Sequence, residues 1–199
     1  MKLVLEKLTK TFPGRKVFKD VSIEVDKGKT LVITGPNGSG KTTMMKIISS
    51  LMPATSGKVI FQNNGSSFSG VEILPFIGFV APDLFLYDEL TALENLTFFA
   101  SVSGITGVDF ELKLTEFGLK GRGGDLVRSY SSGMKQRLKY VLATMKSPQI
   151  LMLDEPTANL DEDGKMMVDR VIKNHHGITV IATNEEKELE YGDSIYRLN

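Results

Sequence analysis

Three short runs of the chain are apolar without interruption, at Leu31–Ile33, Ile150–Leu153 and Ile178–Ala182. A strand that is covered on both faces has this pattern, whereas a strand with one exposed face alternates between apolar and polar residues. Alternation of this kind occurs at residues 21–25, which read VSIEV. The pattern therefore predicts an α/β fold in which a parallel sheet is joined by antiparallel strands near the N-terminus.

A helix is predicted between the second and third apolar runs. Acidic residues at 161–163 suit the positive N-terminal end of a helix. The apolar residues that follow share one helical face: Met167, Val168, Val171 and Ile172. The order strand, helix, strand predicts a right-handed βαβ unit.

The middle of the chain, about residues 84–146, reads mostly helical. Its clearest helix is predicted at Ser131–Lys146, where five apolar residues form one stripe: Met134, Leu138, Val141, Leu142 and Met145. We expect a single domain in which this helical subdomain is inserted into an α/β core made of residues 1–83 and 147–199. Residues 62–75 are rich in turn-forming types, and we predict a loop there.

Composition narrows the classes of function. The 199 residues include 24 Lys and Arg and 24 Asp and Glu, so the formal net charge is zero. A neutral chain does not attract nucleic acid over a long range, and we expect no nucleic-acid partner. There is no cysteine, which excludes disulfides and Cys-based zinc sites. No stretch approaches the roughly 20 apolar residues that span a bilayer. We expect a soluble, cytoplasmic protein that reaches a membrane only through a partner.

The sequence GPNGSGKT at residues 35–42 fits the phosphate-binding loop pattern G-x-x-x-x-G-K-[ST]. Glycines let the backbone N–H groups turn inward toward phosphate oxygens, and the helix that follows adds its positive end. In this pattern Lys41 reaches the β- and γ-phosphates and the Thr42 hydroxyl ligates Mg²⁺. The predicted nucleotide-binding residues here are Gly35, Pro36, Asn37, Gly38, Ser39, Gly40, Lys41, Thr42 and Thr43.

The apolar run at residues 150–153 ends in two adjacent carboxylates, Asp154 and Glu155. Ionised carboxylates at the edge of a core are costly unless they meet a cation or a hydrogen-bond network. The alternative is a pair that caps a helix ahead of Pro156. The phosphate loop upstream favours a cation site.

A third string, SYSSGMKQR, occupies residues 129–137. A Ser-Gly turn that opens a helix can bind an anion through its free N–H groups, although alone it is also an ordinary helix cap. The three strings, in this order and at this spacing, resemble the ATP-binding-cassette (ABC) ATPase family over essentially the whole chain. The family signature is L-S-G-G-Q, and this copy departs at Tyr130, Ser132 and Met134.

The resemblance implies a P-loop NTPase fold that takes ATP and Mg²⁺. It implies that Asp154 holds the metal through water and that Glu155 is the general base for hydrolysis. Ser131 and Gly133 of one subunit then contact the ATP bound by a second one, so two protomers enclose two nucleotides. Asp161 falls in the D-loop, ANLD at residues 158–161, near the same interface.

Phe12 lies where the family has an aromatic residue that stacks on adenine. It is also compatible with a core phenylalanine at a strand end.

Two positions depart from the family pattern. Pro82 falls where a glutamine normally joins Mg²⁺ and water to the helical subdomain, and Asp83 beside it is either a substitute or a solvated loop carboxylate. Asn184 falls where the family has its switch histidine, and an amide can neither carry a charge nor shuttle a proton. We place Asn184 among the catalytic residues and expect slow hydrolysis. His175 and His176 are predicted to form an exposed helix end.

The function that the resemblance implies is an ATPase subunit of a membrane transporter, at the inner face of the cell membrane. Its partners are separate transmembrane permease subunits and a second ATPase protomer, identical or different. The string DELTALENLTFF at 88–99 resembles short bacterial ATPases of the haem-exporter type. The alternative is a soluble module that nucleotide binding switches. Exposed aromatics within Phe76–Tyr87 are a candidate docking surface, or else part of the core.

Overall fold

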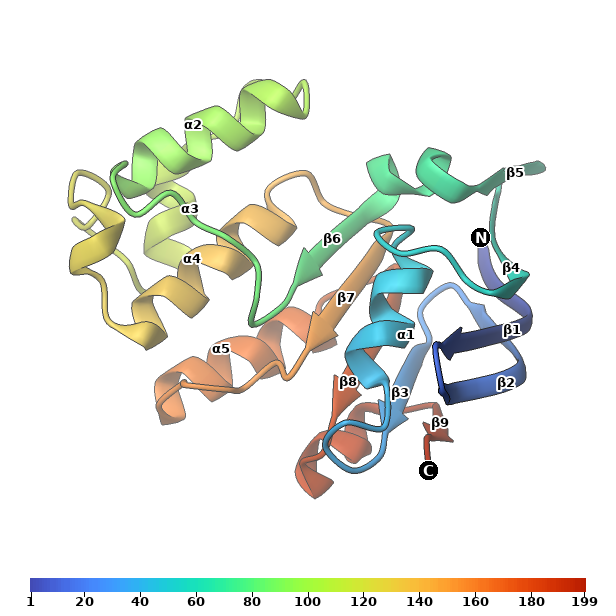
Figure 1. Ribbon diagram of the computed structural model, residues 1–199. Coiled ribbons are helices and arrows are strands. Elements are labelled where there is room, and N and C mark those ends of the chain that lie inside the picture. The colour runs from blue at the N-terminus through green and yellow to red at the C-terminus, as the bar shows by residue number, and fades with distance from the viewer.

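The uninterrupted apolar runs form the centre of a five-stranded sheet in which every neighbouring pair is parallel. The computed structural model describes residues 1–199, and the strand order is β6-β7-β8-β3-β9 (Figure 1). The strands are β3 (Thr30–Thr34), β6 (Ile77–Val80), β7 (Ile150–Asp154), β8 (Ile178–Thr183) and β9 (Ser194–Arg197). The predicted parallel sheet is confirmed.

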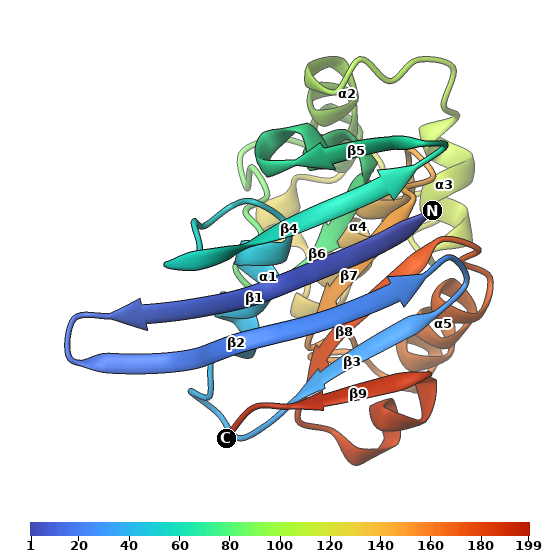
Figure 2. The same cartoon turned by 90° about the vertical axis from the view of Figure 1, so that its right-hand side faces the viewer.

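A second, antiparallel sheet has the order β2-β1-β4-β5 and lies in front of the parallel sheet in Figure 2. Its strands are β1 (Lys2–Phe12), β2 (Arg15–Asp26), β4 (Ser56–Asn63) and β5 (Ser66–Ser69). In β2, Val21 and Val25 are buried while Ser22 and Glu24 are exposed. The alternation therefore marked a half-exposed antiparallel strand, as predicted.

The prediction of a loop at residues 62–75 is wrong. This segment contains the end of β4, all of β5 and most of a 3₁₀ helix, η1 (Gly70–Phe76). Three aromatic rings hold it against the core, with centroids 4.9 Å apart for Phe61 and Phe76 and 4.7 Å apart for Phe68 and Phe76. Aromatic packing therefore outweighs the turn-forming composition.

The strands β3, β6, β7 and β8 contribute residues to two separate cores, because successive side chains point to opposite faces. In β3, Val32 belongs to one core while Leu31 and Ile33 belong to the other. The first core lies between the parallel sheet and the helices of the middle region together with α5 (Glu162–Lys173). The second lies between the two sheets and includes α1 (Lys41–Ile48) (Figure 1).

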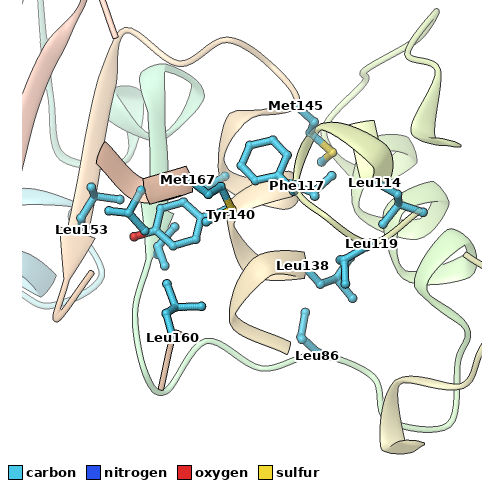
Figure 3. Close-up of a cluster of buried hydrophobic side chains, with 14 of the residues drawn as sticks. Leu86, Leu114, Phe117, Leu119, Leu138, Tyr140, Met145, Leu153, Leu160 and Met167 are labelled. Carbon is cyan, nitrogen blue, oxygen red and sulfur yellow. The ribbon is translucent and has the colours of Figure 1, made fainter. Parts of the chain in front are cut away.

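The middle region, called the helical lobe from here on, is mostly helical, as predicted. It contains α2 (Ala92–Val102), α3 (Phe110–Glu116), the 3₁₀ turn η2 (Val127–Ser129) and α4 (Ser132–Thr144). Figure 3 shows Tyr140 of α4 beside Leu153 of the sheet and Met167 of α5, with Leu114 and Leu138 farther into the helical lobe. The helical lobe and the sheet thus share one continuous core.

The helix predicted after Asp161 is α5 (Glu162–Lys173), and the Asp161 carboxylate caps it by accepting from the Gly164 N–H at 2.8 Å. A final 3₁₀ helix, η3 (Glu186–Tyr191), connects β8 to β9. The prediction of an exposed helix end holds for His176 but is wrong for His175. His175 is half-buried, its Nε2 is inaccessible, and burial lowers the pKa of the ring.

Candidate functional site

The phosphate loop joins β3 to α1 at the carboxyl end of β3. A Cβ on Gly35 would lie 2.3 Å from the Leu198 carbonyl oxygen, and a Cβ on Gly40 would lie 2.1 Å from a Val17 methyl group. Both glycines also have positive φ angles, 152° and 106°. Only glycine therefore fits these two positions, which is the reason the motif requires it.

The Lys41 ammonium lies inside this loop. Lys41 Nζ donates to the Gly35 carbonyl at 2.8 Å and to the Pro36 carbonyl at 3.4 Å. It also lies 3.9 Å from Glu155 Oε1. The lysine is buried and is held by neutral carbonyls and one nearby carboxylate, so it is poised for a stronger anionic partner.

Thr42 and Asp154 meet although they are far apart in the sequence. Thr42 Oγ1 donates to Asp154 Oδ2 at 2.7 Å. Asp154 is fully buried and its Oδ1 has no hydrogen-bond partner. Burial raises the pKa of Asp154, although the bond from Thr42 opposes this. An unpaired buried carboxylate oxygen beside a threonine hydroxyl is the donor set that Mg²⁺ prefers, so these residues fit the metal.

Glu155 is the first residue beyond β7 and has a positive φ of 50°. Its N–H donates to the Ala182 carbonyl at 2.8 Å, which fixes it to the end of β8. Burial raises the pKa of Glu155, the Lys41 ammonium lowers it, and the nearby Asp154 raises it. A carboxylate in this environment is a better proton acceptor than a solvated one.

Asn184 follows β8 and faces the phosphate loop. Its Nδ2 donates to Asn37 Oδ1 at 3.3 Å. The structure thus brings together the phosphate loop, Asp154, Glu155 and Asn184 from three neighbouring strands, as expected at the carboxyl edge of an open α/β sheet.

Residues 81–83, where the family's glutamine is missing, contact the neighbouring helices through other groups. Asp83 Oδ2 forms an ion pair of 2.6 Å with Lys46 Nζ of α1. Lys139 of α4 donates to the carbonyls of Ala81, at 3.0 Å, and Pro82, at 2.7 Å. Asp83 therefore pairs with the helix of the phosphate loop, and the Pro82 side chain itself is exposed.

Phe12 lies at the end of β1, and its side chain is 39% exposed. Lys10 Nζ lies 4.8 Å from the centroid of its ring. A second contact nearby could not be predicted from the sequence: the Arg15 guanidinium donates to the Gly38 carbonyl. The β1–β2 hairpin is therefore linked to the phosphate loop, and Phe12 is too exposed to be an ordinary core residue.

Ser131 and Gly133 lie at the start of α4, where Ser131 Oγ caps the helix by accepting from the Met134 N–H at 3.2 Å. Asp161 also accepts from Arg137 Nη2 at 2.8 Å. Figure 1 shows the start of α4 well away from the loop that precedes α1. One chain therefore does not bring Ser131 and Gly133 to its own phosphate loop.

The aromatic residues of 76–87 divide into two groups. Phe76 and Phe79 pack against the core between the two sheets. Phe85 is 68% exposed, and Tyr87 is partly exposed and packs edge-on against Phe98 of α2 at 5.1 Å. Only the second group forms a surface that a partner can contact.

This fold and site define a P-loop nucleotide-binding cassette. The sequence model of the family described as "ABC transporter" matches residues 18–158, and the chain belongs to this family of ATPases. The predicted P-loop α/β fold is confirmed. No helix is both long enough and apolar enough to cross a membrane.

Relatives of known name extend the comparison. The chain is 32% identical to the linearmycin resistance ATP-binding protein LnrL of Bacillus subtilis, over 94% of this chain and 62% of LnrL. It is also 32% identical to HrtA of Staphylococcus aureus, a protein named for hemin import, over 100% of this chain and 97% of HrtA. The chain thus spans less than two thirds of LnrL but nearly all of HrtA.

Two solved structures have the same fold. An ATP-binding subunit of an ABC transporter superposes with a TM-score of 0.88 at 26% identity, over 100% of this chain and 86% of that chain. A dimeric ATP-binding cassette in a post-hydrolysis state with ADP and phosphate superposes with a TM-score of 0.86 at 25% identity, over 99% of this chain and 94% of that chain.

Proposed function

We propose that this chain hydrolyses Mg·ATP as the ATPase subunit of a membrane transporter. The observation that carries the proposal is the contact of Thr42 with the buried Asp154, whose second oxygen is unpaired, beside Lys41 and Glu155. These residues supply a phosphate cradle, a metal site and a base within one cluster. When bound, Mg²⁺ neutralises charge on the β- and γ-phosphates.

The chain's own residues would act as follows. The loop N–H groups and Lys41 Nζ bind the β- and γ-phosphates, so that the Lys41 ammonium exchanges two carbonyl partners for phosphate oxygens. Thr42 and Asp154 orient the metal. Glu155 accepts a proton from the water that attacks the γ-phosphate, and its raised pKa favours this transfer.

Hydrolysis should be slow. Pro82 offers no side-chain donor or acceptor, and the Asn184 amide is neutral. Losing one donor to a developing charge costs about 10²–10³ in rate. Because Glu155 and Lys41 are both in place, we expect turnover to be reduced and not abolished.

The active form should be a head-to-tail dimer. The start of α4, which carries Ser131 and Gly133, lies well away from the phosphate loop of its own chain, so the ATP bound by one chain completes its contacts with the signature of a second. The nucleotide is then part of the interface, and ATP stabilises the dimer by mass action. The second chain is either a copy of this one or a different cassette.

Permease subunits are the proposed membrane partners, and the exposed aromatic group of Phe85, Tyr87 and Phe98 is the proposed contact surface. The chain would then lie at the inner face of the membrane. The names of its relatives refer to linearmycin and to hemin, which are chemically different, so we assign no cargo. The resemblance of residues 88–99 to haem-exporter ATPases stays a prediction.

The second candidate is a nucleotide-switched module without transport. The observation that favours it is the amide pair of Asn184 and Asn37 at the switch position, because a switch needs nucleotide binding and dimerisation more than fast turnover.

Steady-state ATP hydrolysis with Mg²⁺ tests the proposal, with Glu155→Gln as the matched variant and light scattering as the measure of dimerisation. We expect slow turnover that Glu155→Gln abolishes, and ATP-dependent dimers that this variant traps. ATP binding without turnover in either protein would refute the ATPase and favour the switched module.

A further inference from the structure

Glu188 is a buried carboxylate to which the mechanism above gives no role. It lies in η3, four residues after Asn184, and is only 4% exposed. Its Oε1 accepts from Thr157 Oγ1 at 2.5 Å, and its Oε2 is buried without a partner. A carboxylate held in this way costs free energy, so a residue of this kind needs an explanation beyond packing.

Thr157 belongs to the turn that begins at Glu155. The Ala158 N–H donates to the Glu155 carbonyl at 3.2 Å, which closes the turn. Glu155 itself has a φ of 50°, a conformation that a non-glycine residue keeps only when its surroundings impose it. The turn therefore depends on the contacts that hold Pro156 and Thr157.

Two side chains from different elements supply these contacts. Tyr140 of α4 donates its hydroxyl to the Pro156 carbonyl at 2.8 Å, and Glu188 of η3 accepts from Thr157. Tyr140 is fully buried, and Glu188 is 4% exposed, while Thr157 between them is partly exposed. The turn that carries Glu155 is therefore held between the helix that starts at the signature and the segment that follows Asn184.

The segment that carries Glu188 is itself fixed to the end of β8. The Glu185 N–H donates to Thr183 Oγ1 at 2.9 Å, and the Glu188 N–H donates to the Glu185 carbonyl at 3.1 Å. Asn184 lies inside this short stretch. The stretch that contains Asn184 is thus joined to Thr157 through the Glu188 carboxylate.

We propose that Glu188 is a positioning residue for Glu155, acting through its hydrogen bond with Thr157. The bond keeps the turn in the conformation that sets Glu155 Oε1 3.9 Å from Lys41 Nζ. A carboxylate suits this role because hydrogen bonds to charged acceptors are roughly twice as strong as neutral ones. The inference rests on the proposed hydrolysis of ATP at this site.

Steady-state kinetics of four single variants and one double variant test the inference. Glu188→Ala removes the acceptor, Glu188→Gln keeps an acceptor oxygen, and Thr157→Val removes the donor at nearly constant shape. Glu190→Ala is the matched control, because Glu190 is an exposed carboxylate in the same 3₁₀ helix. ATP-dependent dimerisation is followed in the Glu155→Gln background with and without Glu188→Ala.

We expect Glu188→Ala and Thr157→Val each to lower kcat by about 10- to 100-fold, since a small misplacement of a catalytic group has this effect. KM should change much less, and Glu188→Gln should restore most of kcat. The double variant that combines Glu188→Ala with Thr157→Val should lose no more kcat than either single variant. Dimerisation should be unaffected, because positioning of the base is not needed for ATP binding.

Three outcomes would overturn the inference. A wild-type protein without turnover would refute both the proposed ATPase and the role of Glu188. If the wild type is active and Thr157→Val has the same kcat, the role of Glu188 is refuted and the ATPase is not. If Glu188→Ala fails to fold, the kcat of Thr157→Val alone tests the role of Glu188. Equal loss of kcat in Glu188→Gln and Glu188→Ala would show that the charge, and not the bond to Thr157, matters.

Discussion

Replacing Tyr140 by phenylalanine is a direct test of how the turn after β7 is held. Tyr140 is fully buried, and its hydroxyl donates to the Pro156 carbonyl at 2.8 Å. Burial, and then the neighbouring Glu188 carboxylate, raise the pKa of this phenol well above 10, so it stays a donor at every working pH. The substitution deletes one oxygen, keeps the ring in the core, and leaves a buried carbonyl without its donor.

The expected cost is about 1–2 kcal/mol, the usual effect of leaving a buried acceptor unpaired. For a chain of this length, 1 kcal/mol corresponds to about 2–4 °C in Tm, so Tyr140→Phe should lower Tm by about 2–8 °C. Thermal unfolding followed by circular dichroism, without nucleotide, measures the change.

Tyr196→Phe is the matched control. Tyr196 also packs against a core, but its hydroxyl forms no hydrogen bond within the chain, so the variant should stay within about 0.5 kcal/mol of the wild type. If Tyr140→Phe unfolds within 1 °C of the wild type, the hydroxyl does not support the turn. If both variants lose equal stability, the loss comes from the ring environment and the reasoning fails.

Three further predictions concern the site and its surroundings. Asn184→His should raise kcat by about 10- to 100-fold because it restores a donor that can be charged. If an ATPase assay shows no acceleration, Asn184 is not the cause of slow hydrolysis. Phe12→Ala should weaken ATP binding by about 2- to 12-fold in calorimetry, since aromatic stacking contributes about 0.5–1.5 kcal/mol, while Phe12→Tyr should bind normally. Burial lowers the pKa of His175, so the unfolded state takes up its proton first and stability falls as pH drops below the unfolded value of 6.5. His175→Asn should flatten the loss of Tm between about pH 7 and about pH 5, and an unchanged slope would show that His175 does not titrate in this way.

The sequence predicted the parts of the fold in which one pattern decides the structure. The runs at 150–153 and 178–182 are buried because β7 and β8 each contribute side chains to both cores, and an uninterrupted apolar run is favourable only where both faces are covered. The phosphate loop could also be predicted from the sequence, because its motif requires glycine at positions 35 and 40. A Cβ at Gly35 would collide with Leu198, and a Cβ at Gly40 would collide with Val17.

Other features depend on partners that are distant in the sequence. Residues 62–75 are full of turn-forming types, but Phe68 and Phe76 fix them against Phe61. The bond between Thr157 and Glu188 joins residues 31 positions apart. Carboxylates are usually exposed, and neither spacing nor composition indicates which one in a chain will be buried, because tertiary contacts decide this.

The two departures at Pro82 and Asn184 affect different properties of the cassette. Pro82 removes a side chain that could contact metal or water, yet Asp83 still pairs with Lys46 of α1, and Lys139 of α4 still holds the Ala81 and Pro82 carbonyls. The helical lobe therefore stays attached to the helix of the phosphate loop by contacts that need no glutamine. Because these attachments are in place while a charged donor is missing at Asn184, we expect the helical lobe to remain coupled to the helix of the phosphate loop and the chemical step to be slowed.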